Sequence, residues 1–295
     1  MRNKILNSIE GRINKSLVDS AILTSEGLSV EQKFFNEIVK DDFEGVRLKD
    51  LVKNYDIKEM SGTFSVVASE DLGDLEFVGE FEKIPVDSLK NLKTIKFEKS
   101  KLSGIIEFNE TQFSDDNTLA DFIIETLYQK LIKSENIEII RLLNKKVAIN
   151  IPSVKGEVGS ENFISTVNTN LKQDSIKNGS IIANYAFYKE IDTYDNRAKG
   201  ILKKEEDKIY YMDKPLYVLG DDCWKDVIQI VPIAFVGNFK RAVGFIEDKE
   251  GNVDISINTK AGFLTDDILA RIKAFCDIKE LLSDSFIKIE VKDGE

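Results

Sequence analysis

The chain has 295 residues, 42% of them hydrophobic, with 52 acidic and 41 basic residues, no histidine and two cysteines. This length and composition suit a folded globular protein, and the net charge of −11 argues against tight binding to nucleic acid because the whole chain repels phosphates. The lack of histidine excludes Ser-His and Cys-His nucleophiles and the most common zinc ligand, and Cys223 and Cys276 lack the CxxC spacing of a zinc site.

Other motifs of chemistry or membrane insertion are also missing from the sequence. No stretch reaches the roughly 18 apolar residues that a membrane span needs, and residues 1–12 lack the apolar core of a signal peptide. No EF-hand, Gly-x-Gly-x-x-Gly or Walker spacing occurs, and the acidic pairs at 41–42, 115–116 and 221–222 are typical of solvated caps and turns. We therefore expect no catalytic, cofactor-binding or metal-binding residues, no cofactor and no membrane partner.

Residues 1–60 are predicted to form helical pieces joined by short links. Ser29 and Gln32 have the spacing of a capping box ahead of the apolar residues from Phe34 to Val39. A second short helix is predicted over Leu48–Asn54. Little in this region could fold alone, so it is interpreted as an arm that needs support.

The pattern becomes extended from Thr63 to Lys101, with strand-like alternation and segregated charge. One arm is acidic and contains no lysine or arginine: Glu70, Asp71, Asp74, Glu76, Glu80 and Glu82. The other is basic: Lys83, Lys90, Lys93, Lys96, Lys99 and Lys101. A long antiparallel hairpin would set these charges opposite each other, but an isolated hairpin is marginal in water. A neighbouring subunit is the natural support. The lysines alternate with apolar residues, which favours one face of a hairpin over a DNA-binding strip.

Residues 118–144 make the clearest helix. Apolar residues recur every four positions from Leu119 through Ile123 and Leu127 to Leu131, and aspartates precede the amide end. At 1.5 Å per residue the helix would be about 40 Å long, the longest rigid element in the chain.

Shorter elements follow this helix. They are a helix over Ser160–Gln173 capped by Ser160, a strand over Ser180–Ala183, a helix near Tyr185–Thr193, short strands through Ile233, and a closing strand at FIKIEV. Residues 268–278 alternate as a strand but also suit a helix. Trp224 is equally consistent with an inter-subunit contact and with packing in a core or loop.

In this order the elements resemble the capsid protein fold of tailed bacteriophages, the Hong Kong ninety-seven type, which encapsulins share. The strongest stretch is residues 94–144, where a strand, a short acidic link and the long helix match the return arm of that family's extended loop and its spine helix. A second passage, residues 180–202, resembles a family passage made of a strand, an asparagine, a helix, an aspartate and a glycine. Asn184 and Gly200 occupy the places of that asparagine and that glycine. A third, residues 236–256, resembles a family hairpin through Gly237, the Phe239–Ala242 run and Gly251.

The resemblance covers about residues 60–295 and implies an α+β fold with four parts. These are an N-terminal arm (1–60), an extended loop (61–101), a peripheral domain on the spine helix (102–175 and 233–277) and an axial domain (176–232 and 278–295). It also implies a strand at 268–278.

The function that the resemblance implies is structural and not enzymatic: a major capsid protein that self-assembles into the pentamers and hexamers of an icosahedral head around double-stranded DNA. Expected partners are other copies of the chain, a portal, a separate scaffolding protein, and packaged DNA contacted weakly and without sequence specificity. The expected location is the virion, with the host cytoplasm during assembly.

Two alternatives remain. An encapsulin shell would hold enzyme cargo, but residues 1–40 do not resemble its cargo-binding helix. A histidine-free cytosolic enzyme using carboxylates and a divalent metal belongs to another class.

Some family members weld neighbouring subunits by joining a loop lysine to an asparagine of the late peripheral domain. Lys83 lies nearest the comparable place for the lysine. No asparagine occurs from Thr259 to Glu295, and the matching neighbourhood contains Asp266 and Asp267. The sequence therefore predicts a shell without covalent cross-links.

Overall fold

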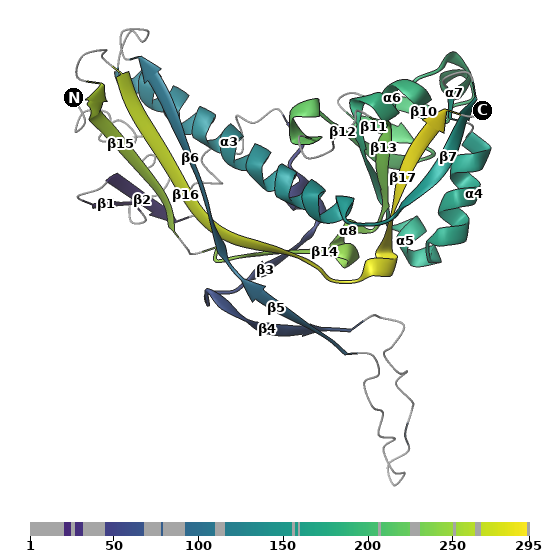
Figure 1. Cartoon of the computed structure of the whole chain (residues 1–295), viewed down its shortest axis with the longest axis horizontal. Coiled ribbons are helices and arrows are strands. Elements are labelled where there is room, and N and C mark those ends of the chain that lie inside the picture. Colours follow the sequence, from purple (N-terminus) through teal and green to yellow (C-terminus); the bar gives the residue numbers. More distant parts are fainter. Residues whose placement is uncertain are drawn as a thin grey trace.

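The computed structural model describes residues 21–24, 27–31, 45–67, 78, 92–109, 116–154, 157–158, 160–205, 208–224, 231–249, 252–262 and 267–293. A long helix, α3 (Asp116–Asn144), lies between two sheets that form the two lobes of the molecule (Figure 1). A two-stranded hairpin, β4 (Ser61–Val66) and β5 (Lys93–Glu98), projects away from both lobes. No helix within these residues is long and apolar enough to cross a membrane.

The first lobe is built on a seven-stranded sheet. Its strands are β1 (Ala21–Thr24), β2 (Gly27–Glu31), β3 (Lys53–Asp56), β6 (Ser100–Asn109), β14 (Val243–Glu247), β15 (Asn252–Gly262) and β16 (Asp267–Glu280). They lie in the order β1-β2-β15-β16-β14-β3, and β6 pairs with β16 as well. The predicted strand at 268–278 is thus confirmed. It lies in β16, which pairs with β6, β14 and β15.

The second lobe is built on an eight-stranded sheet. Its strands are β7 (Ala148–Val154), β8 (Glu157–Val158), β9 (Ser180–Asn184), β10 (Leu202–Glu205), β11 (Lys208–Tyr211), β12 (Lys214–Leu219), β13 (Ile233–Gly237) and β17 (Phe286–Asp293). Their order is β10-β11-β12-β9-β13-β17-β7-β8. Helices α4 (Ser160–Asn170), α5 (Gln173–Lys177), α6 (Tyr185–Ile191) and α7 (Tyr194–Ala198) lie around this sheet (Figure 1). The predicted strand at 180–183 and closing strand are confirmed.

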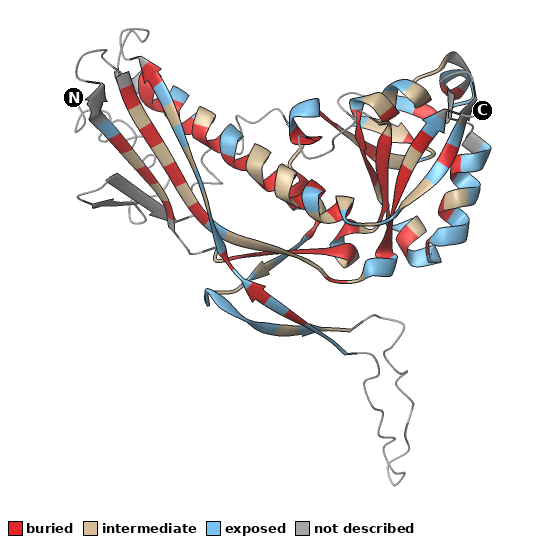
Figure 2. Ribbon diagram, viewed as in Figure 1, coloured by how far each residue is buried: buried red, intermediate tan, exposed pale blue. Residues whose placement is uncertain are grey.

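The predicted long helix is confirmed, and its apolar stripe packs on the first sheet. Leu119, Ile123, Leu127 and Leu131 are all buried against apolar residues of β6, β15 and β16. Figure 2 shows the buried positions repeating along α3 and along the strands beside it. The later half of α3 packs instead in a central cluster with Leu48, β13 and β14.

Asn184 explains why a strand, an asparagine and a helix follow one another. Its side-chain oxygen accepts hydrogen bonds from the backbone N–H of Phe187 at 2.9 Å and of Ile233 at 3.0 Å. Its amide donates to the carbonyl of Val231 at 2.7 Å. The residue therefore caps α6 and also holds β13 beside β9.

The root of the hairpin shows the predicted alternation. Ile95 and Phe97 are buried, whereas Lys96 and Glu98 are exposed. Lysine side chains fix this root to the body: Lys99 Nζ donates to the carbonyl of Ile57, and Lys93 Nζ donates to that of Leu281 at 2.8 Å. The acidic arm, Lys83 and most of the loop lie outside the described residues, as does the predicted pairing of opposite charges.

Two predictions in the N-terminal arm are wrong. Ser29 does not cap a helix, because it lies in β2, which pairs with β15 at Asp254. The free edge of β15 supplies hydrogen bonds that override the local capping signal. The helix predicted over Leu48–Asn54 is only one 3₁₀ turn, η1 (Leu48–Leu51), because β3 then pairs in parallel with β14.

Two further predictions need correction. The helix predicted over Ser160–Gln173 ends at Asn170, and α4 begins with Ser160 itself. The buried Leu171 then separates α4 from α5. Residues 236–256 do not form one hairpin. A helical turn, α8 (Phe239–Ala242), follows β13, and β14 and β15 each pair with β16 rather than with each other.

Two segments pair in a different sheet from the rest of the ranges in which they were expected. Strands β7 and β8 and helix α4, expected in the peripheral range 102–175, belong to the second lobe. Strand β13, expected in the peripheral range 233–277, pairs with β9 and β17 in the same lobe. The chain thus enters the second lobe directly after α3, leaves it after β13 and returns to it with β17.

Candidate assembly site

Four charged side chains meet where the end of the N-terminal arm crosses α3. The Arg47 guanidinium donates to Glu135, with Nε and Nη2 each 3.0 Å from Oε2. Lys49 Nζ lies 3.6 Å from Glu135 Oε1 and also pairs with the carboxylate of Glu247 in β14. These four residues, here named the ion-pair hub, join the arm, the long helix and the first sheet. Their formal charges sum to zero.

Burial makes these pairs important to the fold. The side chains of Lys49, Glu135 and Glu247 are 5%, 1% and 3% exposed. A buried charge that loses its partner costs several kcal/mol, although an intact buried pair contributes little net stability. Moving the arm away from α3 would therefore be costly, because it would separate buried charges from their partners.

Aromatic rings complete the surroundings of the hub. Arg47 Nη1 donates to the Tyr128 hydroxyl at 3.2 Å, and Lys49 Nζ lies 4.7 Å from the centroid of the Phe245 ring. Burial alone would lower the pKa of Arg47, but Glu135 and Tyr128 raise that pKa above its ordinary value. The guanidinium therefore stays charged near neutral pH.

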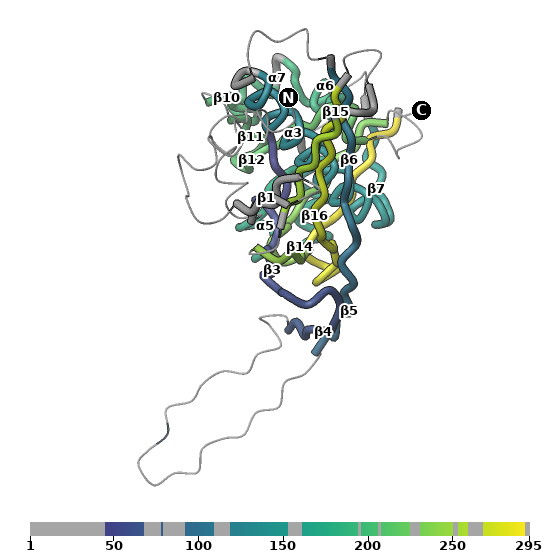
Figure 3. The backbone as a smooth tube through the Cα atoms, turned by 90° about the vertical axis from the view of Figure 1, so that its left-hand side faces the viewer, coloured from purple at the N-terminus to yellow at the C-terminus, as the bar shows by residue number. Residues whose placement is uncertain are grey.

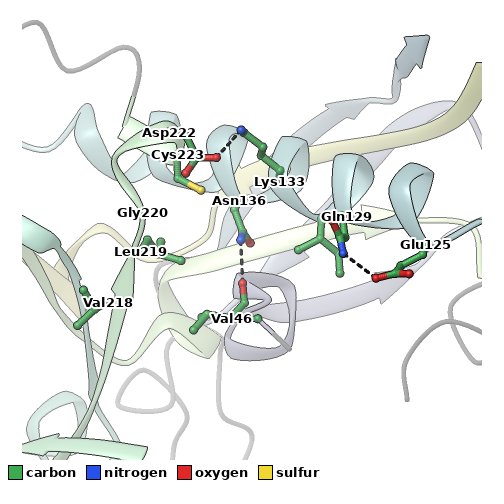
Figure 4. Close-up of a pocket in the computed structure, with 12 residues that line it drawn as sticks. Val46, Glu125, Gln129, Lys133, Asn136, Val218, Leu219, Gly220, Asp222 and Cys223 are labelled. Carbon is green, nitrogen blue, oxygen red and sulfur yellow. Dashed lines mark hydrogen bonds and ion pairs between the residues drawn. The ribbon is translucent and has the colours of Figure 1, made fainter. Parts of the chain in front are cut away.

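Asn136 fixes the backbone next to the hub. Its side-chain oxygen accepts from the N–H of Leu48 at 2.9 Å, and its amide donates to the carbonyl of Val46 at 2.8 Å. Asn136 is buried on α3, so these bonds set the register of the arm along the helix (Figure 4).

A groove of about 610 Å³ opens beside Asn136. It lies between α3, the end of β12 and a 3₁₀ turn, η4 (Asp221–Trp224) (Figure 4). Val46 and Leu219 are apolar residues of its lining, and the Lys133–Asp222 ion pair also lies in the lining. Asp222 itself lies in the η4 turn.

The charged and polar side chains of this region hold the arm, α3 and the first sheet together. Burial raises the pKa of the Cys276 thiol to about 12, so it holds its proton near neutral pH. Within the described ranges, no group of three or more Cys, Asp or Glu side chains could hold a metal ion. Trp224 is buried and stacks on Phe235 with ring centroids 5.7 Å apart. These contacts favour packing in the core over an inter-subunit contact.

Sequence reasoning named no site residue and missed the hub. The available signal was polarity on a buried stripe: Glu135 and Asn136 interrupt the apolar face of α3 between Ile132 and Ile139. Such charges are rarely buried without partners. The partners, however, come from residues 47–49 and 247, and no local pattern connects those positions with α3.

No protein-family model matches the chain, and no curated protein matches it. Solved structures do. A structure from Gordonia phage Cozz is 13% identical, with a TM-score of 0.53, and the match covers 85% of this chain and 87% of that one. The mature capsid of bacteriophage PhiM1 is 8% identical, with a TM-score of 0.52 and coverage of 86% and 89%. The capsid of an empty GTA particle is 9% identical, with a TM-score of 0.51 and coverage of 84% and 93%.

At identities of 8–13%, the similarity to these structures establishes the fold alone. It extends over most of both chains, 84–86% of this chain and 87–93% of the others. The chain therefore has the α+β Hong Kong ninety-seven type fold of phage major capsid proteins.

Proposed function

We propose that the chain is a major capsid protein that assembles into an icosahedral shell around double-stranded DNA. The observation that carries the proposal is the β4–β5 hairpin, which projects beyond both lobes (Figure 1). A two-stranded hairpin is marginal in water without further packing. Neighbouring copies in a closed shell would supply that packing.

The two lobes correspond to the two domains that the resemblance implies. We assign α3 and the seven-stranded sheet to the peripheral domain, and the eight-stranded sheet to the axial domain at the centre of pentamers and hexamers. The net charge of −11 suits a lining that contacts DNA weakly and releases it again. A portal and a separate scaffolding protein would be further partners, and the virion the final location, reached from the host cytoplasm.

Electron microscopy and mass analysis of the purified full-length chain test this function. Closed shells of uniform diameter, with the monomer as their building block, are expected. A discrete small oligomer that never forms shells or sheets under crowding would refute the proposal and favour an enzyme. Shells that copurify with a protein cargo would favour an encapsulin.

A further inference from the structure

Strand β6 is a free edge of the seven-stranded sheet in the part of the chain that the structure describes. Residues Asp267–Lys273 of β16 pair with β15 on one side and with β6 on the other. Among the described strands, β16 is the one partner of the ten-residue strand β6 (Figures 1 and 3). A long free edge presents unpaired backbone N–H and C=O groups and is a template for pairing with another chain.

Side-chain contacts show which residues of β6 turn their backbone groups outward. The carbonyl of Ile105 accepts a hydrogen bond from Lys130 Nζ at 2.5 Å, so it faces away from β16. Ser103 Oγ donates at 2.9 Å to the carbonyl of Ile272, which is the register partner of Gly104 and thus faces β6. Because the N–H and C=O of one residue point to the same side of an antiparallel strand, the odd-numbered residues of β6 face outward.

The sequence of this edge is complementary to itself. Around Gly104 it reads KLSGIIE, from Lys101 to Glu107. If two copies paired antiparallel with Gly104 at the centre, each Lys101 would lie opposite Glu107 of the other copy, and Leu102 opposite Ile106. Outward residues would also meet outward residues, as a strand ladder requires.

Exposure matches this pairing. Lys101 and Glu107 are exposed, and Ile105 is 56% exposed, an unusual position for an isoleucine. Pairing would set opposite charges across from each other twice. It would also place each Ile105 opposite Ser103 of the other copy, with the two Ile105 side chains as diagonal neighbours on one face.

Lys130 occupies this edge in the single chain. A Cβ atom on Gly104 would lie 2.8 Å from Lys130 Cε, so glycine is what lets the lysine pass over the strand to the Ile105 carbonyl. Lysine at a free edge is a common protection against unwanted strand pairing. Lys130 is exposed on α3, and its ammonium group can turn into solvent when a second strand arrives.

We propose that β6 is a twofold docking edge, which pairs with β6 of a second copy around Gly104 and is guarded by Lys130. The inference adds one specific contact to the proposed shell and does not depend on it. One strand pair buries less than the roughly 1,000 Å² of a stable interface, so the contact would form mainly at high local concentration.

Charge reversal tests the register. Lys101→Glu and Glu107→Lys should each lower the association constant about tenfold, because like charges would then face each other twice. The double variant should restore association to near the starting value, and Lys130→Ala should raise it. Sedimentation at low salt measures these constants. Equal association in both single variants and the starting chain would overturn the proposal.

A disulfide trap tests the centre of the pairing. In the Gly104→Cys/Lys130→Ala variant the two new thiols would lie across a non-hydrogen-bonded pair, with Cα atoms about 4.5 Å apart, which a disulfide can span. Oxidation should give a band at twice the 33.4 kDa monomer mass. The control, Glu107→Cys/Lys130→Ala, should give none, because its thiols would be about 20 Å apart by strand rise.

The outcomes separate this inference from the proposed function. Shells without the trapped dimer would overturn the docking edge and leave the capsid function standing. A trapped dimer from a chain that forms no shells would support the docking edge and refute the function. Equal cross-linking in variant and control would also overturn the docking edge.

Discussion

Removing Lys49 from the ion-pair hub should destabilise the folded chain strongly. Lys49 is the hub cation that contacts Glu247, and both side chains are buried. In a Lys49→Met variant the Glu247 carboxylate would remain in place without that cation. Breaking one partner of a buried pair typically costs 3–5 kcal/mol, so we expect a loss of about 4 kcal/mol in the free energy of unfolding.

Two further variants show whether the loss comes from breaking the Lys49–Glu247 ion pair. Lys49→Met/Glu247→Gln removes both charges and should recover most of the stability, since a buried pair replaced as a whole costs little. Lys133→Met breaks the Lys133–Asp222 pair, whose side chains are 40% and 51% exposed, and should cost less than about 1 kcal/mol.

Urea unfolding of the unassembled chain, followed by fluorescence of Trp224, measures these differences through the midpoint and slope. Salt provides a second readout, because screening weakens the exposed pair and hardly affects the buried one. A loss below about 1 kcal/mol for Lys49→Met, or a double variant as unstable as the single one, would refute the reasoning.

Other predictions concern the core, the loop, a thiol and the shell. Leu127→Ala should lower the unfolding free energy by about 2–5 kcal/mol, because Leu127 is buried between α3 and the first sheet; urea titration checks this. Deleting residues 73–89 should leave a folded chain that closes no shells, as seen by electron microscopy. Cys276, with its pKa of about 12, should be alkylated at pH 8 on the order of a thousandfold more slowly than a free cysteine, as followed by peptide mass mapping. Boiled, reduced particles should run as one band near 33.4 kDa.

The sequence predicted the elements whose signals are periodic. The four-residue repeat of α3 and the two-residue alternation of β5 and β16 both reflect burial on one side, and burial is what the structure shows at Leu127, Phe97 and Ile272. The alternative helix at 268–278 is wrong because β6, β14 and β15 pair with this segment and require an extended backbone.

Local signals failed where distant strands offered hydrogen bonds. Ser29 had the spacing of a helix cap, yet β15 pairs with that segment. Residues 53–54 continued a helical pattern, yet β14 binds them as a parallel strand. The ion-pair hub was invisible for the same reason, since Arg47 and Glu135 are 88 residues apart and meet only through the fold.

The prediction of a single band depends on chemistry at the end of the first sheet. An asparagine can be joined to a lysine because attack on its amide carbon expels ammonia. A carboxylate such as that of Asp267 is a poor target, because the same bond would require loss of oxide or hydroxide. Lys83 and Asp266 lie outside the described residues, whereas Asp267 begins β16, opposite Asn109 of β6 in the strand register.

Buried area and interlocked arms should then hold the shell, so detergent, heat and reductant should release monomers only. A ladder of covalent multimers under these conditions would overturn the prediction. The strand pairing indicates where the missing partner would be, because Asn109 in β6 and Asn258 in β15 flank the same part of β16. Repeating the gel with Asn109→Asp and with Asn258→Asp would identify the partner. Substitution of the responsible asparagine removes the amide leaving group and should abolish the ladder.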